Sequence, residues 1–438
     1  MSKIILRTCY SDEINEKLAG KKVRVAGWVH TIREHGNIKF LILRDRTGNI
    51  QITASKERVG NIITKISSLG KEDVILVEGV VKKEKKAPTG VEIIPEKIDI
   101  ISKSQPLPLD FRVKTGLNKR LNYRVIDLRK PEVSAIFKIQ SKLVEGMVEY
   151  LREKGFIQVF TPCLIGAASE SGAEVFPVLY YDKEAFLRQD PQLHRELLIL
   201  AGFDSIFDLG PSWRAEPSHT TRHLSEYFGC AVELGFIKDE RSIMRVEEEL
   251  IVNAIKKVKK DCREELRLLN KEIKIPKTPF PELKFPEIYD ILRERGKKIK
   301  FGEDYDRESE MLLSEYVKDK YKSEFFFVNR FPSKAKPFYV MKVDEDPKWA
   351  RSVDLLFKGL ELSSGGQREH RYTKLVEQIK EKGMKLENMK WFTEFFRYGA
   401  PPMGGFNIGI ERLTMQLLDL ENIREASLFP RAPERLLP

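Results

Sequence analysis

The first hundred or so residues alternate between apolar and polar positions in short segments that turn residues separate. The segments cover residues 23–30, 39–45, 48–53, 73–81 and 91–98, with a helix-like insert at residues 56–68. A period of two predicts strands with one buried face, and the Gly36-Asn37 pair predicts a turn between the first two. Five strands with one helical insert are typical of the oligonucleotide-binding barrel, an all-β fold.

Prolines follow the predicted barrel at Pro106 and Pro108 and indicate a boundary. A connector rich in arginine and lysine comes next. We therefore expect a barrel domain over residues 1–104, a basic linker over residues 105–131 and a larger domain over residues 132–438. The positive charge of the linker could contact an RNA backbone, or it could rest on acidic groups of the protein itself.

The rest of the chain mixes helical and strand patterns. Apolar residues recur with helical spacing over residues 132–155, and further helices are predicted at residues 191–201, 240–269 and 286–298. Strands are predicted at residues 156–162, 185–187, 205–209, 230–236, 325–328, 338–341 and 352–357. Because hairpins outnumber regular strand-helix-strand units, we expect an α+β domain built on an antiparallel sheet.

Composition and charge narrow the class of protein. The chain has 438 residues, more than a single core usually supports, so two or three domains are expected. Its 77 basic residues outnumber its 66 acidic residues and give a net charge of +11, which suits a polyanionic partner such as a nucleic acid. A surface rich in lysine and glutamate is also typical of thermophilic proteins, which offers a second explanation for the charged residues.

Several signals are absent from the sequence. There is no run of about 18 apolar residues and no secretory leader, so we expect a soluble, cytoplasmic protein with no membrane partner. The four cysteines have no CxxC spacing, which argues against structural zinc and against a disulfide framework. There is also no Walker loop and no strand-anchored GxGxxG, so side chains from the sheet would have to hold any nucleotide.

One segment, residues 212–228, combines the chemistry that binds a nucleoside triphosphate. Two arginines can neutralise phosphate, two glutamates can accept a hydrogen bond from an adenine amino group, and two aromatic rings can stack on the base. These residues are, in that order, Arg214 and Arg222, Glu216 and Glu226, and Tyr227 and Phe228. Charged segments usually face water, so this segment alone could equally be a solvated hairpin loop.

Three segments resemble, in order and separation, the three signature motifs of the class II aminoacyl-tRNA synthetases. They are the helix and strand that end at Thr161-Pro162, the segment that begins Trp213-Arg214-Ala215-Glu216, and residues 404–413. With the barrel, the whole chain resembles the archaeal-type aspartyl-tRNA synthetases. The resemblance implies ATP and Mg²⁺ as cofactors, L-aspartate and tRNA(Asp) as substrates, and a homodimer formed through the first motif.

The resemblance also assigns roles at the ATP site. Arg214 would hold the α-phosphate and stabilise the transition state, and Arg412 would act with it as the second catalytic residue. The other ATP-binding residues would be Glu216, Arg222, His223, Tyr227 or Phe228, Glu361 and Gly409. The residues near magnesium would be Asp354, Glu361 and Ser364, which offer the oxygen ligands that this hard cation takes. Salt-bridged strand ends are the alternative for the two acids.

At the amino-acid site the resemblance implies six contact residues. They are Glu170, Asp190, Gln192, Arg195, Ser364 and Arg368. Four positions depart from the family pattern: Asp190 stands in place of Ser, Arg195 in place of Lys, Ala231 in place of an ammonium-binding Asp, and Met403 in place of His. Asp190 could supply the acid that is missing at position 231. Two cations facing the substrate side chain would still select a carboxylate, so we expect aspartate.

On the barrel the resemblance implies an anticodon-binding face. Its residues would be Trp28, His30, Arg33, Phe40, Gln51, Pro88 and Glu92, among them aromatic rings that can stack on unpaired bases. Trp28 and Phe40 could instead be barrel core. His30 and the Ala87-Pro88 loop resemble enzymes that accept either third anticodon base, which predicts charging of tRNA(Asn) as well. Two alternatives stay open: an asparaginyl-tRNA synthetase, and a paralogue with altered specificity or a role outside translation.

Overall fold

The computed structural model describes residues 6–55, 60–166, 175–217 and 219–438. The chain forms two compact units, Met1–Lys114 and Thr115–Pro438. Each unit has an apolar core of its own. No helix in the described ranges is long and apolar enough to cross a membrane.

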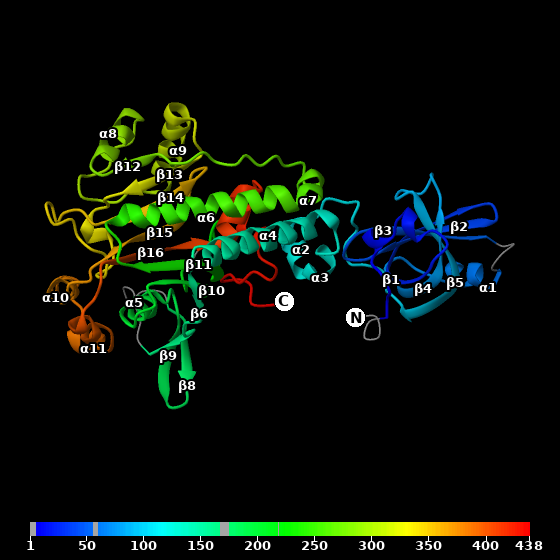
Figure 1. Ribbon diagram of the computed structural model, residues 1–438, viewed down its shortest axis with the longest axis horizontal. Coiled ribbons are helices and arrows are strands. Elements are labelled where there is room, and N and C mark those ends of the chain that lie inside the picture. The colour runs from blue at the N-terminus through cyan, green and yellow to red at the C-terminus, as the bar shows by residue number, and fades with distance from the viewer. Residues whose placement is uncertain (1–5, 56–59, 167–174, 218) are drawn as a thin grey trace. The chain divides into compact units, whose positions relative to one another are not determined.

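The first unit is a closed barrel of five strands in the order β1-β2-β3-β5-β4 (Figure 1). The elements are β1 (Lys22–His35), β2 (Ile38–Arg44), β3 (Asn49–Ser55), α1 (Gly60–Ser67), β4 (Val74–Lys83) and β5 (Val91–Ser102). Alternate residues such as Val25, Leu41 and Ile52 fill the interior and are at most 1% exposed. The alternation in the sequence therefore predicted the barrel correctly.

The second unit is built on an eight-stranded sheet in the order β12-β13-β14-β15-β16-β11-β10-β6. The strands are β6 (Ile157–Val159), β10 (Ser205–Trp213), β11 (Glu226–Gly235), β12 (Glu282–Lys284), β13 (Phe325–Asn329), β14 (Ser352–Phe357), β15 (Leu360–Arg368) and β16 (Met403–Gly409). Among the described strand pairs of this sheet, only β6–β10 and β12–β13 are parallel. The predicted α+β domain on a mainly antiparallel sheet is confirmed.

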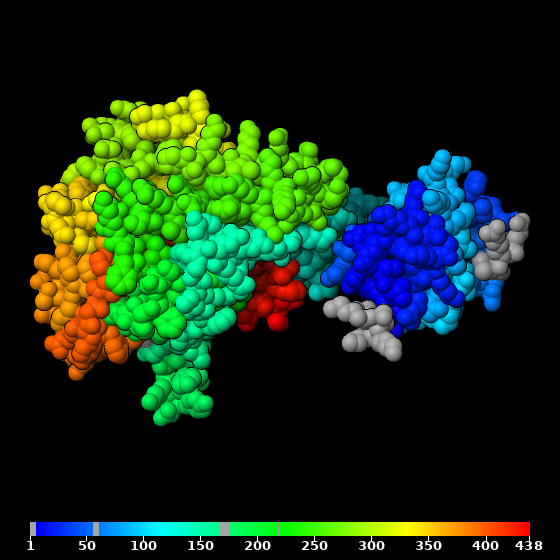
Figure 2. Space-filling model, viewed as in Figure 1, coloured from blue at the N-terminus to red at the C-terminus, as the bar shows by residue number. Residues whose placement is uncertain are grey.

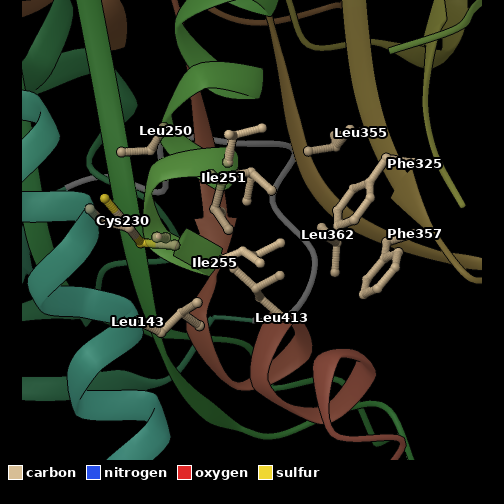
Figure 3. Packing of buried hydrophobic residues seen from close by; sticks show 14 of the residues in the cluster. Leu143, Cys230, Leu250, Ile251, Ile255, Phe325, Leu355, Phe357, Leu362 and Leu413 are labelled. Atoms are coloured by element: carbon tan, nitrogen blue, oxygen red, sulfur yellow. The ribbon is translucent and has the colours of Figure 1, made fainter. Parts of the chain in front are cut away.

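Two long helices, α4 (Pro131–Glu153) and α6 (Glu240–Asp261), cover one face of this sheet (Figure 1). Leu143 of α4 and Ile251 of α6 point into the same apolar core as Cys230 of β11 (Figure 3). Burial of these side chains holds the helices against the sheet. The opposite face of the central strands is therefore free to carry polar side chains.

Shorter elements surround the sheet. The helices are α2 (Leu117–Asn122), α3 (Arg124–Asp127), α5 (Gln192–Leu200), α7 (Arg263–Leu268), α8 (Glu287–Glu294), α9 (Arg307–Tyr321), α10 (Tyr372–Glu381), α11 (Leu386–Thr393) and α12 (Ile410–Leu417). A second sheet consists of β7 (Leu164–Ile165), β8 (Pro177–Tyr180) and β9 (Lys183–Leu187). The β8–β9 hairpin stands out from the surface of the second unit (Figure 2).

Three predicted elements differ from the structure. The helix predicted over residues 240–269 breaks at Cys262, whose φ of −114° and ψ of 36° are not helical. The helix predicted over residues 286–298 ends at Glu294, and α9 was not predicted at all. The predicted strand at residues 338–341 forms only an isolated bridge between Val340 and Arg368. All four residues of this apolar segment are buried in the core. A short apolar run of this kind resembles a buried strand in the sequence, which explains the wrong prediction.

The basic residues at the start of the second unit rest on groups of that unit. Arg124 is 1% exposed and donates hydrogen bonds to the backbone oxygens of Ser427 and Leu428 at 2.7 and 3.0 Å. Arg120 pairs with Asp127 and Glu425. These two arginines therefore serve the packing of the second unit, and carboxylates of that unit pair with both of them.

Candidate active site

A cavity lies on the face of the large sheet that α4 and α6 leave uncovered. Antiparallel pairing puts Asp208, Ala231, Asn407, Ser364 and Asp354 in one row across five strands of this face. The predicted residues that line the cavity are Asp190, Gln192, Arg214, Arg222, His223, Tyr227, Glu361, Ser364, Arg368, Gly409 and Arg412. Segments from distant parts of the sequence thus meet at one site.

The aromatic pair at the start of β11 is divided between two faces. Tyr227 lines the cavity, and the guanidinium carbon of Arg214 lies 5.8 Å from its ring centroid. Phe228 points to the opposite face of the strand, is 47% exposed and does not line the cavity. The prediction that either ring could stack on adenine is therefore corrected: strand alternation leaves Tyr227 and excludes Phe228.

Arg214 lies just past the end of β10. Its backbone N–H donates to the carbonyl of Ser225 at 3.0 Å, which fixes the chain at this point of the loop. Its guanidinium is 3.7 Å from the carboxylate of Glu216, and the two side chains are 47% and 34% exposed. Glu216 itself does not line the cavity, although its partner Arg214 does.

Arg222 has a partner that sequence reasoning missed. Its guanidinium lies 3.3 Å from a carboxylate oxygen of Glu310, which comes from α9. Burial, with a smaller contribution from the nearby charge of Glu361, raises the pKa of Glu310 to about 7. Glu310 is thus a titrating carboxylate beside an arginine of the cavity. Because α9 was not predicted, no pattern pointed to this pair.

Arg412 lies in the first turn of α12, and it lines the cavity. It donates to the backbone oxygen of Glu361 at 2.9 Å and to the carboxylate of the same residue at 3.4 Å. Gly409 directly precedes α12, and a side chain added there would lie near Arg412. His223 also lines the cavity, and burial together with the nearby charge of Arg412 lowers its pKa.

Asp354 lies one row away from Glu361, on the same face of the sheet. Ser364 donates to its carboxylate at 2.7 Å, and the ammonium of Lys336 is 3.1 Å away. Burial, opposed by Lys336 and reinforced by Glu361, raises the pKa of Asp354 to about 7. The alternative of salt-bridged strand ends is partly correct, because Lys336 pairs with Asp354 and Arg412 pairs with Glu361.

These oxygen atoms have the chemistry that magnesium prefers. Two carboxylates and one hydroxyl on one sheet face fit a hard cation that keeps several waters or substrate oxygens. Within the described residues, no three His, Cys, Asp or Glu side chains come together as a metal site. Asp354, Glu361 and Ser364 would therefore need phosphate or water oxygens to complete a coordination shell.

At the end of the cavity where the amino acid was predicted to bind, the structure differs from the expectation of two cations that face the substrate side chain. Arg195 has a side chain that is only 1% exposed, and both of its terminal nitrogens lie 2.8 Å from the carboxylate of Asp190. Despite burial, this pairing lowers the pKa of Asp190. Arg195 does not line the cavity, whereas Asp190 and Arg368 do. Only one of the two predicted cations faces the substrate space.

Arg368 is held by a network of buried partners. Its Nε donates to Glu233 at 2.9 Å, and its Nη2 donates to Gln192 Oε1 at 2.9 Å. Gln192 in turn donates to Glu233 at 2.9 Å. Glu233 was missed in the sequence, although it lies two residues beyond Ala231 and therefore on the same face of β11.

Met403 and Ala231 are the other two positions that differ from the family pattern. Met403 is fully buried in an apolar cluster with Leu193 and Phe338 and does not line the cavity. Ala231 is 3% exposed and lies directly between Asp208 and Asn407 in the sheet. Glu170, predicted to close on the substrate, lies outside the described residues.

The predicted anticodon residues are at least partly exposed, except Glu92, which is only 2% exposed. Trp28 and Phe40 are partly exposed and do not belong to the core cluster, so the alternative of barrel core is excluded. Register places Arg33 beside Phe40, and Gln51 beside Glu92. Glu92 accepts from Gln51 at 3.1 Å.

His30 and Pro88 are the other two predicted anticodon residues of the barrel. His30 is half-buried on β1, and its Nδ1 has no hydrogen-bond partner among the described residues. Pro88 is exposed in the loop between β4 and β5. The register thus groups an aromatic ring with an arginine, and an amide with a carboxylate, on neighbouring strands.

Comparisons with known proteins agree with this geometry. Residues 116–433 match the family described as tRNA synthetases class II (D, K and N), and residues 23–101 match the OB-fold nucleic acid binding domain. The chain is 48% identical to an aspartate--tRNA(Asp) ligase of Pyrococcus furiosus, over 99% of this chain and 100% of that protein. It is 43% identical to an aspartate--tRNA(Asp/Asn) ligase of Methanopyrus kandleri, with the same coverage.

A solved structure extends the likeness to three dimensions. The asparaginyl-tRNA synthetase of Pyrococcus horikoshii, complexed with asparaginyl-adenylate, has a TM-score of 0.92 and 35% identity over 98% of this chain and 99% of that one. The matched family spans nearly all of the second unit, and the relatives span both units. The chain belongs to the class II tRNA synthetases of the D, K and N group and carries their OB-fold domain.

Proposed function

We propose that this chain activates L-aspartate with ATP and transfers the aspartyl group to tRNA(Asp). Arg368 carries the proposal, because its guanidinium faces the amino-acid end of the cavity and offers a rigid fork that matches a carboxylate. Relatives at 46–48% identity are named as ligases of aspartate and tRNA(Asp), which supports the same substrate.

The chemistry follows from positioning and charge. A carboxylate oxygen of aspartate attacks the α-phosphorus of ATP, pyrophosphate leaves, and a mixed anhydride forms. Arg214 would hold the α-phosphate and stabilise charge in the transition state, while Arg412 and His223 would hold the outer phosphates. A terminal ribose hydroxyl of tRNA then attacks the aspartyl carbonyl, and AMP leaves. Juxtaposing the reactants in one cavity supplies much of the acceleration.

The nucleotide base would stack on Tyr227, which lines the cavity. Glu216, which lies beside Arg214, would accept a hydrogen bond from the adenine amino group. Asp354, Glu361 and Ser364 would hold Mg²⁺, which would neutralise part of the triphosphate charge. Glu170 would close over the substrate ammonium, as the family resemblance implies.

ATP-pyrophosphate exchange with each of the twenty amino acids tests the amino-acid specificity. Aspartate should support exchange, and asparagine should not. Asparagine is the second candidate, because the Asp190–Arg195 pair cancels one of the two cations that would otherwise attract a carboxylate. Exchange that depends on asparagine alone would replace the proposal with this second candidate. Exchange with neither would favour a paralogue with altered specificity or a role outside translation.

We also propose that tRNA(Asn) is a substrate. The half-buried His30 and the exposed Pro88 loop support this, as do relatives named as ligases of both tRNAs. Charging of tRNA(Asp) and tRNA(Asn) transcripts with labelled aspartate should reach comparable efficiencies. A value for tRNA(Asn) below about a thousandth of that for tRNA(Asp), or ~4 kcal/mol, would restrict the enzyme to tRNA(Asp).

A homodimer and a cytoplasmic location complete the proposal. β6 is an edge strand of the large sheet, and the neighbouring side chains of Ile157 and Phe160 are 49% and 85% exposed. Apolar side chains on an open edge need a cover, and a second copy related by a two-fold axis would supply one. Sedimentation equilibrium should give the mass of a dimer.

The proposed location is the cytoplasm, because the tRNA substrates are found there.

A further inference from the structure

The site face of the large sheet is divided into rows of side chains about 6.6 Å apart, because alternate residues of a strand share a face. Tyr227 lies at the nucleotide end, followed by a row of glycines that includes Gly229 and Gly409. Asn407 lies in the next row, between Ala231 and Ser364. The middle of the cavity, where the two substrates must meet, is therefore the row of Asn407.

The amide of Asn407 occupies space that a glycine leaves open. A Cβ atom at Gly229 would lie 2.2 Å from Asn407 Oδ1, so the amide lies directly over this glycine. Asn407 lines the cavity, and its Oδ1 is buried with no hydrogen-bond partner among the described residues. The nearest hydroxyl in the row, that of Ser364, donates to Asp354 instead.

A buried acceptor without a partner is costly, and native proteins rarely leave one unless a ligand completes it. The Arg368–Glu233 pair lies over the row next to that of Asn407. An aspartate whose side-chain carboxylate is held by Arg368, and whose reacting carboxylate points toward the nucleotide, brings its α-ammonium to the row of Asn407. Ala231, the neighbour of Asn407 in this row, has no acceptor in its side chain.

We propose that Oδ1 of Asn407 accepts a hydrogen bond from the α-ammonium group of the amino-acid substrate, a role that rests on the proposed function. Asn407 would then be a substrate-binding residue that works with Asp190, the acid that lines the same cavity. The pair would grip the ammonium with one charged acceptor and one neutral acceptor.

Succinate, which is aspartate without its ammonium group, separates this role from a structural one. In pyrophosphate exchange, Asn407→Ala should raise the KM for aspartate by about 10- to 100-fold, the loss of a hydrogen bond to a charged group. The inhibition constant of succinate should stay unchanged. Asn407→Asp keeps the acceptor and should retain most of the affinity for aspartate. Asn388→Ala, an exposed amide of α11, is the matched control and should change neither constant.

Two results would overturn the proposal. Equal losses of aspartate and succinate binding would mean that Asn407 only fills space over Gly229. A loss that appears with ATP and disappears with 2′-deoxy- or 3′-deoxy-ATP would assign the acceptor to a ribose hydroxyl. Thermal unfolding of each variant checks that the fold is intact. If another amino acid supports exchange in the wild type, that amino acid and its desamino analogue replace aspartate and succinate, so failure of the proposed function is distinguished from failure of this inference.

Discussion

Tyr227 and Phe228 are neighbours in the chain but lie on opposite faces of β11. Only Tyr227 lines the cavity, beside Arg214. The sequence motif places an aromatic pair at this point, but the motif alone does not say which member faces the nucleotide. Alternation along β11 decides the matter, because Tyr227 shares a face with Ala231, whose neighbour Asn407 lines the cavity.

The two rings form a matched pair of variants. Tyr227→Ala should raise the KM for ATP by about three- to tenfold, because stacking on a base contributes about 0.5–1.5 kcal/mol beyond area burial. Phe228→Ala should leave the KM for ATP unchanged. Pyrophosphate exchange at saturating aspartate measures both constants. A larger effect for Phe228→Ala would mean that the strand carries the opposite face toward the nucleotide.

Three arginines in or beside the cavity pair with carboxylates of the protein. Arg195 pairs with Asp190, Arg368 with Glu233, and Arg222 with Glu310. Residue types in the motifs indicate the cations, whereas most of their acidic partners come from other elements. Counting the cations alone therefore overstates how strongly the cavity attracts a carboxylate.

At the scale of elements, α9 gives the nucleotide end a carboxylate that no motif contains. Glu310 of this helix is 3.3 Å from Arg222 and has a pKa raised to about 7, chiefly by burial. Above that pKa the carboxylate is charged and competes with a triphosphate for Arg222. Below it the carboxyl is protonated and the competition ends.

Glu310→Gln keeps an acceptor for Arg222 but removes the charge. About one pH unit above the pKa of about 7, the KM for ATP should be three- to tenfold lower in the variant than in the wild type, since one negative charge near the phosphates is gone. About one unit below, the two values should converge. Glu308→Gln, an exposed residue of the same helix, is the control. A difference that does not change with pH would mean that Glu310 does not titrate in this range.

Periodicity predicted the elements whose pattern is strong. Residues Ile139, Leu143 and Met147 of α4 follow helical spacing and are fully buried. In α9, by contrast, only Ser309, Leu313 and Val317 are buried among charged neighbours, so its apolar stripe is too thin to detect. The helix predicted over residues 240–269 shows the opposite error, because an apolar stripe continues across the break at Cys262.

The candidate site was predictable as far as its motifs extend. Arg214, Arg412 and Glu361 come from separate segments. The family resemblance predicted that they share one site, and all three line the cavity. Lys336 and Asn407 were not found, because their roles depend on which strands become neighbours in the sheet. Contacts between residues this far apart in the sequence are not encoded in any local pattern.

At the scale of the whole molecule, a barrel and a catalytic unit are joined in one chain. The barrel carries aromatic and polar groups on its outer face, and the catalytic unit carries a cavity lined by cationic and acidic groups. A net charge of +11 adds a general attraction for polyanions. Each unit matches its own family, and the relatives contain both, which is consistent with an enzyme that must recognise a tRNA and activate an amino acid.

Aminoacylation of a tRNA(Asp) transcript tests the account most directly. The purified full chain is incubated with ATP, Mg²⁺ and either labelled aspartate or labelled asparagine, and acid-precipitable label is followed over time. The account predicts ATP-dependent esterification of aspartate and none of asparagine. Esterification of asparagine in place of aspartate, or of neither amino acid, would contradict it.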